Sequence, residues 1–282
     1  MNEIERYELP GGEVRPHPCG NAALSFLCCL AVLLTLWPGK ALAGPPFITD
    51  DPEPVEYQNW EFYIASMDSK IEGDWSGTAP HFEVNYGVVP DLQLHLIAPV
   101  AYDLPPEGAG RYGAGDLELG TKYRFIHETN GWPQVGIFPL VEVPTGSAAD
   151  NLGNGHLQVF LPLWVQKSWG KWTAYGGGGY GINSLSGSQN WNFVGAVLQR
   201  QVLTNLFIGA EVYHQSVYQT DFPNLGTAFN VGTVYDFNEH QHLLFSIGRD
   251  IDGPTKFQCY IAWQFTFDNG LFKSHAGLGS GK

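Results

Sequence analysis

The chain has 282 residues, of which 44% are hydrophobic and only 15% charged, and its formal net charge is −14 at pH 7. So acidic a chain lacks the basic surface that binds phosphate backbones, which excludes nucleic acid as a partner. It also contains 35 Gly and 19 Pro, a turn-rich composition that suits many short connections between strands.

The first part of the chain has the layout of a secretory signal peptide. Residues 22–37 are almost purely apolar, and Ala41-Leu42-Ala43 follows as a small-residue cleavage site. A membrane anchor is the alternative, but this run is shorter than the roughly 20 residues that a helical span needs. We therefore predict a signal peptide over 1–43 and a mature chain over 44–282.

The mature chain remains acidic and nearly free of cysteine. Three of the 14 basic and four of the 28 acidic residues precede residue 44, which leaves 11 basic and 24 acidic residues. Cys259 is the one cysteine after the leader, so the monomer forms no internal disulfide and no zinc site of several thiolates. No change of composition marks a linker. We expect a periplasmic segment over 44–59, one barrel domain, and a C-terminal tail over 268–282.

Twelve strand-like segments run from Trp60 to Phe267, and the links between them alternate between long and short. The long links are Asp68–Pro80, Asp103–Ala114, Pro144–Gly155, Asn183–Asn190, Tyr218–Leu225 and Arg249–Pro254. The short links are Pro90–Asp91, Glu128–Gly131, Ser168–Lys171, Thr204–Asn205 and Asn238–Gln241. Such sorting is typical of outer-membrane barrels, in which every second turn faces the periplasm and is short. The sequence therefore predicts an all-β fold, an antiparallel transmembrane β-barrel of about 12 strands.

The strands alternate apolar and polar side chains, which a barrel directs to lipid and lumen respectively. Residues 117–125 are the clearest case, because Leu, Thr, Tyr and Phe alternate there with Glu, Gly, Lys and Arg. The predicted pore-lining residues are Glu83, His95, Glu118, Lys122, Arg124, Glu142, Gln158 and Glu211. The alternative is a closed barrel whose inward charges pair with one another, Glu118 with Lys122 or Arg124 for example.

Two features depart from regular strands. Pro139 and Pro162 lie inside apparent strands, where each removes a ladder donor, and we expect a bulge at each. Gly176-Gly177-Gly178-Gly179 lacks the Lys-Ser/Thr and helix of a phosphate loop, so it predicts a bend or a closely packed stretch of wall.

Five stretches in order resemble a known family. They are Asp50-Asp51-Pro52 through Trp60-Glu61-Phe62, Gly115–Phe125, Pro144-Thr145-Gly146, Gly209–Tyr213 and Leu243–Asp250. Together they are similar to the outer-membrane transporter family named for the meta pathway of phenol degradation. The resemblance implies an outer-membrane barrel that passes small hydrophobic or aromatic compounds.

The leading hypothesis is a passive channel, with outer-membrane lipid, a small-molecule solute and the barrel-assembly machinery as partners, and with no cofactor, metal or catalytic residue. One alternative is a lipid hydrolase, because His214 and Ser216 lie two residues apart on one strand face. Another is a structural or adhesive barrel whose acidic residues bind cations. The acidic residues in question are Asp50, Asp51, Glu53, Asp250 and Asp252.

Overall fold

The computed structural model describes residues 46–185, 189–216 and 226–269. The predicted signal peptide over 1–43 and all but the first two residues of the predicted tail lie outside these ranges. The described residues contain a single short 3₁₀ helix, Ala148–Asp150, and the remaining elements are strands. No helix among them has the length and apolar character that a membrane crossing requires.

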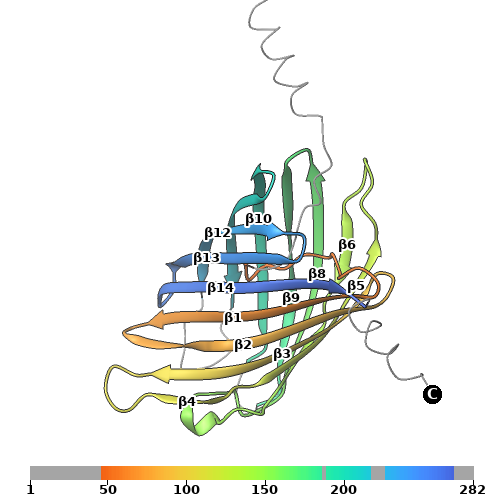
Figure 1. The fold of residues 1–282 in the computed structure, drawn as a ribbon. Helices are drawn as coiled ribbons and strands as arrows, with labels where there is room; N and C mark the ends of the chain where they lie inside the picture. Colours follow the sequence, from red (N-terminus) through yellow and green to blue (C-terminus); the bar gives the residue numbers. More distant parts are fainter. Residues whose placement is uncertain (1–45, 186–188, 217–225, 270–282) are drawn as a thin grey trace, which may run out of the picture. The chain divides into compact units, whose positions relative to one another are not determined.

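The strands follow one another around a single sheet. They are β1 (Asn59–Ile71), β2 (Asp74–Val89), β3 (Leu92–Leu104), β4 (Arg111–Ala114), β5 (Leu117–Ile126), β6 (Gln134–Ile137), β7 (Leu140–Val143), β8 (Gln158–Trp169), β9 (Trp172–Asn183), β10 (Trp191–Leu203), β11 (Leu206–Gln215), β12 (Thr227–Asn238), β13 (Gln241–Asp252) and β14 (Thr255–Asp268). All pairings between them are antiparallel, and β1 pairs with β14 along its whole length, which closes the barrel (Figure 1).

Two of the barrel strands are interrupted. β4 and β5 both pair with β3, and β6 and β7 both lie between β5 and β8. Each couple therefore forms one strand of the wall, and the barrel has twelve strands. This confirms the predicted fold class and strand number.

The two prolines share one interruption instead of forming two bulges. Pro139 lies in the gap between β6 and β7. Pro162 pairs with Gly179 on β9 without a shift of register, and on its other side it faces that gap. The prolines thus sit side by side where ladder pairs are absent, so neither removes a donor from an intact ladder.

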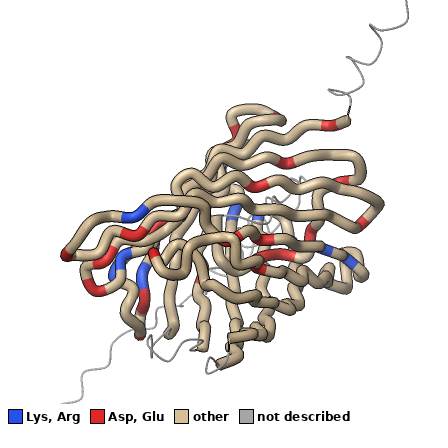
Figure 2. The backbone as a smooth tube through the Cα atoms, turned by 90° about the horizontal axis from the view of Figure 1, so that it is seen from below, with Lys and Arg blue, Asp and Glu red and all other residues tan. Residues whose placement is uncertain are grey.

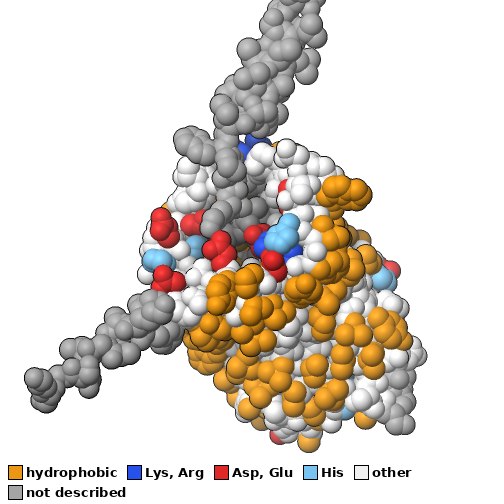
Figure 3. Space-filling model, turned by 90° about the vertical axis from the view of Figure 1, so that its right-hand side faces the viewer, with side chains coloured by type: hydrophobic (Ala, Val, Ile, Leu, Met, Phe, Trp, Pro, Cys, Tyr) orange, Lys and Arg blue, Asp and Glu red, His pale blue; other side chains and the backbone are white. Residues whose placement is uncertain are grey.

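The outer and inner surfaces of the wall differ in the way the alternation predicts. Many outward side chains are large, apolar and exposed, among them Leu94, Leu161, Leu198, Ile208, Val212 and Ile261. Figure 3 shows hydrophobic side chains covering the flank of the barrel, with charged side chains and His gathered near one end. An apolar outer face on a closed barrel is the surface that lipid covers. The protein has the fold and the outer surface of a transmembrane β-barrel.

Candidate functional site in the barrel lumen

Residues 46–58, here named the luminal segment, lie against the inner face of the wall. Phe47 packs with Tyr175 of β9 and Val197 of β10. The Ser246 hydroxyl of β13 donates a 2.6 Å hydrogen bond to the carbonyl of Pro46. We expected this part of the chain to be a periplasmic segment. Its described residues instead occupy the lumen of the barrel.

Glycines of the wall make room for the luminal segment. An added Cβ on Gly209 or Gly232 would come within 3.0 Å of the Phe47 ring. An added Cβ on Gly195 would lie only 1.9 Å from the Thr49 hydroxyl. Glycine inside a strand often marks a place where another chain segment approaches closely. The wall is therefore shaped to the segment that crosses it.

Glu211 of β11 holds the backbone of the luminal segment. Its carboxylate accepts hydrogen bonds from the backbone N–H of Ile48 at 3.2 Å and of Thr49 at 2.5 Å. The Asn230 side chain of β12 donates a third bond at 2.6 Å. Glu211 is 1% exposed, so these three donors compensate the desolvation of its carboxylate.

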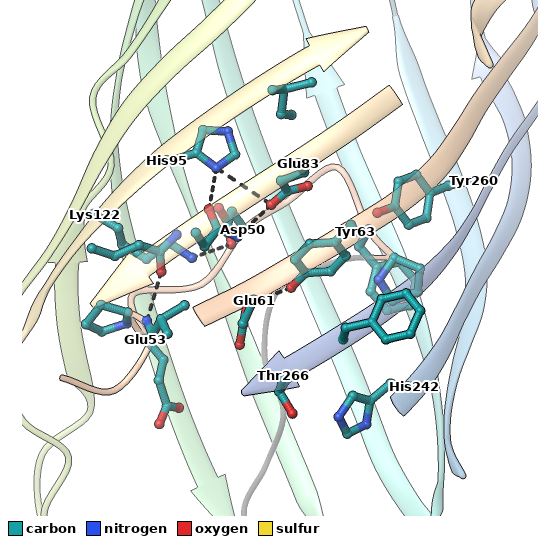
Figure 4. A pocket seen from close by; sticks show the side chains of 18 of the residues that line it. Asp50, Glu53, Glu61, Tyr63, Glu83, His95, Lys122, His242, Tyr260 and Thr266 are labelled. Carbon is teal, nitrogen blue, oxygen red and sulfur yellow. Dashed lines mark hydrogen bonds and ion pairs between the residues drawn. The ribbon is translucent and has the colours of Figure 1, made fainter. Parts of the chain in front are cut away.

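Lys122 of β5 holds the acidic middle of the luminal segment. Its Nζ lies 2.9 Å from Asp50 Oδ1 (Figure 4). It is 3.8 Å from Asp51 Oδ2. It also lies 4.9 Å from the centroid of the Phe138 ring, a cation–π contact. Burial raises the pKa of the Asp51 carboxyl well above its usual range, and Lys122 opposes this rise. The positive charge of Lys122 is thus shared between two carboxylates.

Arg124, also on β5, binds nearer the short turns. Its guanidinium donates to Asp91 Oδ1 at 2.7 and 3.0 Å and to Gln134 Oε1 at 3.0 Å. Glu53 of the luminal segment lies 3.7 Å from Arg124 and accepts bonds from Gln134 and Gln166 at 3.2 and 3.3 Å. These contacts attach the later part of the segment to β5, β6 and β8.

Inward side chains of β1, β2, β3 and β5 form a hydrogen-bonded polar surface, here named the polar arc. Its members are Glu61, Tyr63, Glu83, Asn85, His95, Glu118 and Lys122. His95 lies at its centre, 2.7 Å from Asn85 Oδ1, 3.0 Å from Glu118 Oε1 and 3.6 Å from Glu83 Oε1. Glu118 therefore pairs with His95 and not with Lys122 or Arg124, the partners that the closed-barrel alternative assigned to it.

Inward side chains of β8, β10 and β11 form a second surface, here named the aromatic arc. Its members are Phe160, Trp164, Trp191, Phe193 and Tyr213. Phe160 stacks on Trp191 with ring centroids 4.7 Å apart, and Phe193 stacks on Tyr213 at 5.7 Å. The sequence analysis did not predict these residues to line the lumen. Phe160 and Trp164 nevertheless share the parity of Gln158 on β8, and Tyr213 shares that of Glu211 on β11.

Two cavities lie among the described residues of the lumen. The larger, of about 1550 Å³, lies beside the luminal segment, and Glu83, His95, Glu118 and Lys122 are among the residues that line it. The smaller, of about 340 Å³, is lined by Glu118, Glu142 and Gln158 among others. Arg124 and Glu211, the remaining predicted pore-lining residues, line neither cavity; they bind the wall and the luminal segment.

The residues behind the alternative functions are engaged elsewhere. His214 Nδ1 lies 3.1 Å from the Thr227 hydroxyl, and the Ser216 hydroxyl accepts a 2.8 Å bond from the Asn192 N–H. The structure therefore brings His214 and Ser216 into contact with other partners and not with each other. Among the residues described, no group of three or more His, Cys, Asp or Glu is arranged to hold a metal ion.

Comparison with known proteins gives matches in structure alone. No family model and no curated protein matches the sequence. The COG4313 outer membrane channel from Pseudomonas putida F1 is 16% identical over 77% of this chain and 98% of that chain, with a TM-score of 0.63. The chain has that channel's fold.

Two further solved structures are more distant. OmpF of Salmonella typhi is 9% identical over 74% of this chain and 96% of its own, with a TM-score of 0.39. The toluene transporter TodX of Pseudomonas putida is 8% identical over 74% of this chain and 88% of its own, with a TM-score of 0.37.

Proposed function

We propose that this barrel is a passive outer-membrane channel for small compounds, including hydrophobic and aromatic ones. The observation that carries the proposal is the length of the larger cavity. It is lined by both Asn59 and Ser69, ten residues apart on β1, which corresponds to roughly 33 Å of strand. A bilayer core is about 30 Å thick, so a path of this length passes through most of the membrane beside the luminal segment.

The two arcs support the choice of solute. The polar arc offers hydrogen-bonding groups and the aromatic arc offers rings, and the larger cavity touches both, through Glu83 and His95 on one side and Phe160 and Trp164 on the other. Mostly apolar pockets with a few placed polar groups are the usual sites for small organic molecules. The outer-membrane channel that shares this fold supports the channel role and not the choice of solute.

Planar-bilayer recording of refolded residues 44–282 tests the proposal. We expect stepwise single-channel currents, and larger steps after deletion of residues 46–58, because that segment occupies part of the lumen. Charge-removing substitution of Glu118 and Lys122 is expected to change the ion preference, since charges in a narrow lumen tune selectivity.

A folding control accompanies these recordings. Folded barrels are identified by a heat-dependent shift on electrophoresis, which each variant must show. If the folded parent and the folded deletion variant both stay silent and pass no benzyl alcohol in a vesicle uptake assay, the channel proposal is wrong.

A further inference from the structure

The smaller cavity has no role in the proposed channel so far. The strand residues that line it lie where strands meet the long links: Glu142 precedes the link after β7, Gln158 begins β8, and Trp191 begins β10. It shares Glu118, Leu140 and Phe160 with the larger cavity. The two cavities therefore adjoin each other near the end of the barrel that carries the long links.

One side of the smaller cavity is aromatic. The rings of Phe160 and Trp191 are stacked with an interplanar angle of 16°. Gly181 of β9 makes this arrangement possible, since an added Cβ there would lie 1.9 Å from the Trp191 ring. A flat aromatic pair held in this way presents the negative face of a ring, which attracts organic cations as well as other rings.

The opposite side carries acceptors. Glu118 and Glu142 are direct neighbours across β5 and β7, and Glu142 is the neighbour of Gln158 across β7 and β8. Asn154 Nδ2 donates one bond of 2.9 Å to Glu142. Gln158 is 7% exposed. Its Oε1 has no hydrogen-bond partner among the described residues; its amide makes one 3.4 Å contact, to His156.

The charges of the cavity are of one sign. None of the described residues that line it is Lys, Arg or His. The nearest basic residue on β5, Lys122, is already paired with Asp50 and Asp51 of the luminal segment. A ligand that fills this cavity therefore meets two carboxylates and an amide oxygen. Glu118 is paired with His95 at 3.0 Å, whereas Glu142 has no basic partner among the described residues and accepts only the Asn154 bond. Figure 2 shows the same excess of acidic over basic positions around the barrel as a whole.

The geometry points to a binding site for small organic ammonium ions that carry an aromatic or apolar body, with the ammonium toward Glu118, Glu142 and Gln158 and the body against Phe160 and Trp191. This inference rests on the proposed channel, because it names a solute class for the same lumen. An ammonium group replaces its lost water with carboxylate and amide acceptors, and the aromatic faces add cation–π attraction. A carboxylate of the same size meets two like charges there and is rejected.

The test is calorimetric titration of the folded, full mature barrel in a neutral detergent with two probes of matched size, phenethylammonium chloride and sodium phenylacetate. We expect phenethylammonium to bind and phenylacetate to bind at least about tenfold more weakly, a difference of about 1.4 kcal/mol. Glu142→Gln keeps the size of the side chain and is expected to weaken phenethylammonium binding about tenfold. Trp191→Leu is expected to weaken it about fivefold, and Trp191→Phe to recover most of that loss.

Glu107→Gln is the matched control. Glu107 lies exposed on the long link between β3 and β4, so it loses the same charge outside the lumen and should leave both affinities unchanged. If the two probes bind equally, or if Glu142→Gln binds phenethylammonium as the parent does, the site is not one for organic cations. Conductance and benzyl alcohol uptake are recorded separately, so a barrel that conducts but shows no probe discrimination refutes this inference alone, whereas silence of both the parent and the deletion variant without uptake refutes the channel.

Discussion

Two parts of the barrel wall, the polar arc and the stretch of β9 and β10 that packs against Phe47, hold the luminal segment by opposite means. On the polar arc a single cation, Lys122, binds the carboxylates of Asp50 and Asp51. On the opposite wall Phe47 fits among Tyr175, Val197 and the glycine positions of neighbouring strands. The first mode is electrostatic and depends on ionisation, whereas the second is a matter of shape and burial.

This difference between the two parts of the wall explains why the luminal segment begins with apolar residues and continues with acidic ones. Its apolar start faces the wall that offers rings and glycines, and its acidic middle faces the wall that offers a cation. Glu211 adds a third kind of contact, because it binds backbone N–H groups and so places few demands on the side chains of Ile48 and Thr49. Removing one kind of contact at a time separates their contributions.

The largest effect is expected at Lys122. Lys122→Met removes the cation that lies 2.9 Å from Asp50 and 3.8 Å from the buried Asp51, and removing one partner of a buried pair costs up to about 3–5 kcal/mol. The luminal segment should detach, measured as faster maleimide labelling of Val55→Cys in a Cys259→Ser background. Lowering the pH should bring the labelling rate of Lys122→Met back toward that of the Val55→Cys parent measured at the same pH, because protonated carboxyls need no counter-charge. Each rate is compared with the parent at the same pH, since acid slows the reaction of every thiol with maleimide. Labelling that is unchanged in Lys122→Met would show that the ion pairs contribute nothing to docking.

Phe47→Ala tests the opposite wall. Phe47 is 9% exposed, and truncation of a buried Phe costs about 3 kcal/mol or more. The same labelling assay should show release of the segment, but here a change of pH should give no recovery, because no charge is involved. An acid-dependent recovery in Phe47→Ala would contradict the division between an electrostatic and a packing contact.

Gly195→Ala is expected to have an intermediate effect. Its added methyl collides with the Thr49 hydroxyl, and overpacking of this kind costs about 1–3 kcal/mol. Thr49→Ala removes the colliding oxygen and should restore part of the docking in the double variant. Gly131→Ala is the control, since nothing lies within 4 Å of a Cβ at that turn. Equal labelling of the two single variants would mean that the wall does not fit the segment closely.

The smallest effect is expected at Arg111. Its ion pair with Asp103 measures 3.1 Å, but the Arg111 side chain is 42% exposed, and exposed pairs contribute at most about 1 kcal/mol. Arg111→Ala should leave both segment labelling and the thermal unfolding of the barrel nearly unchanged. A loss comparable to that of Lys122→Met would mean that exposure is a poor guide to the strength of ion pairs here.

The strands of the barrel wall could be predicted from the sequence because the signals that define them are local. Alternation of side chains and alternation of link length are both set within about ten residues, and together they gave twelve strands and the inward parity of Glu83, Lys122 and Glu211. Pro162 was harder, because whether a missing donor matters depends on the neighbouring strand, which is interrupted at Pro139.

The position of the luminal segment inside the barrel could not be predicted from such local signals. Its contacts join residues about 160 positions apart, such as Thr49 and Glu211, and no period in residues 46–58 indicates them. One usable signal was present: Gly195, Gly209 and Gly232 lie at inward positions of successive strands, where a missing side chain indicates a close neighbour. The aromatic arc was overlooked because rings on inward positions look the same as core residues until the strands are assembled.

The pairing of β1 with β14 joins the first strand to the last, and Trp60 Nε1 donates a 2.7 Å hydrogen bond to Asn269. Closure of the barrel therefore requires β14, the last of the described strands. A polypeptide cut short before Thr255 would leave the free edges of β1 and β13 in hydrocarbon, where each unpaired backbone group costs several kcal/mol. Stable closure of the wall thus depends on the strand that lies farthest along the described chain from β1.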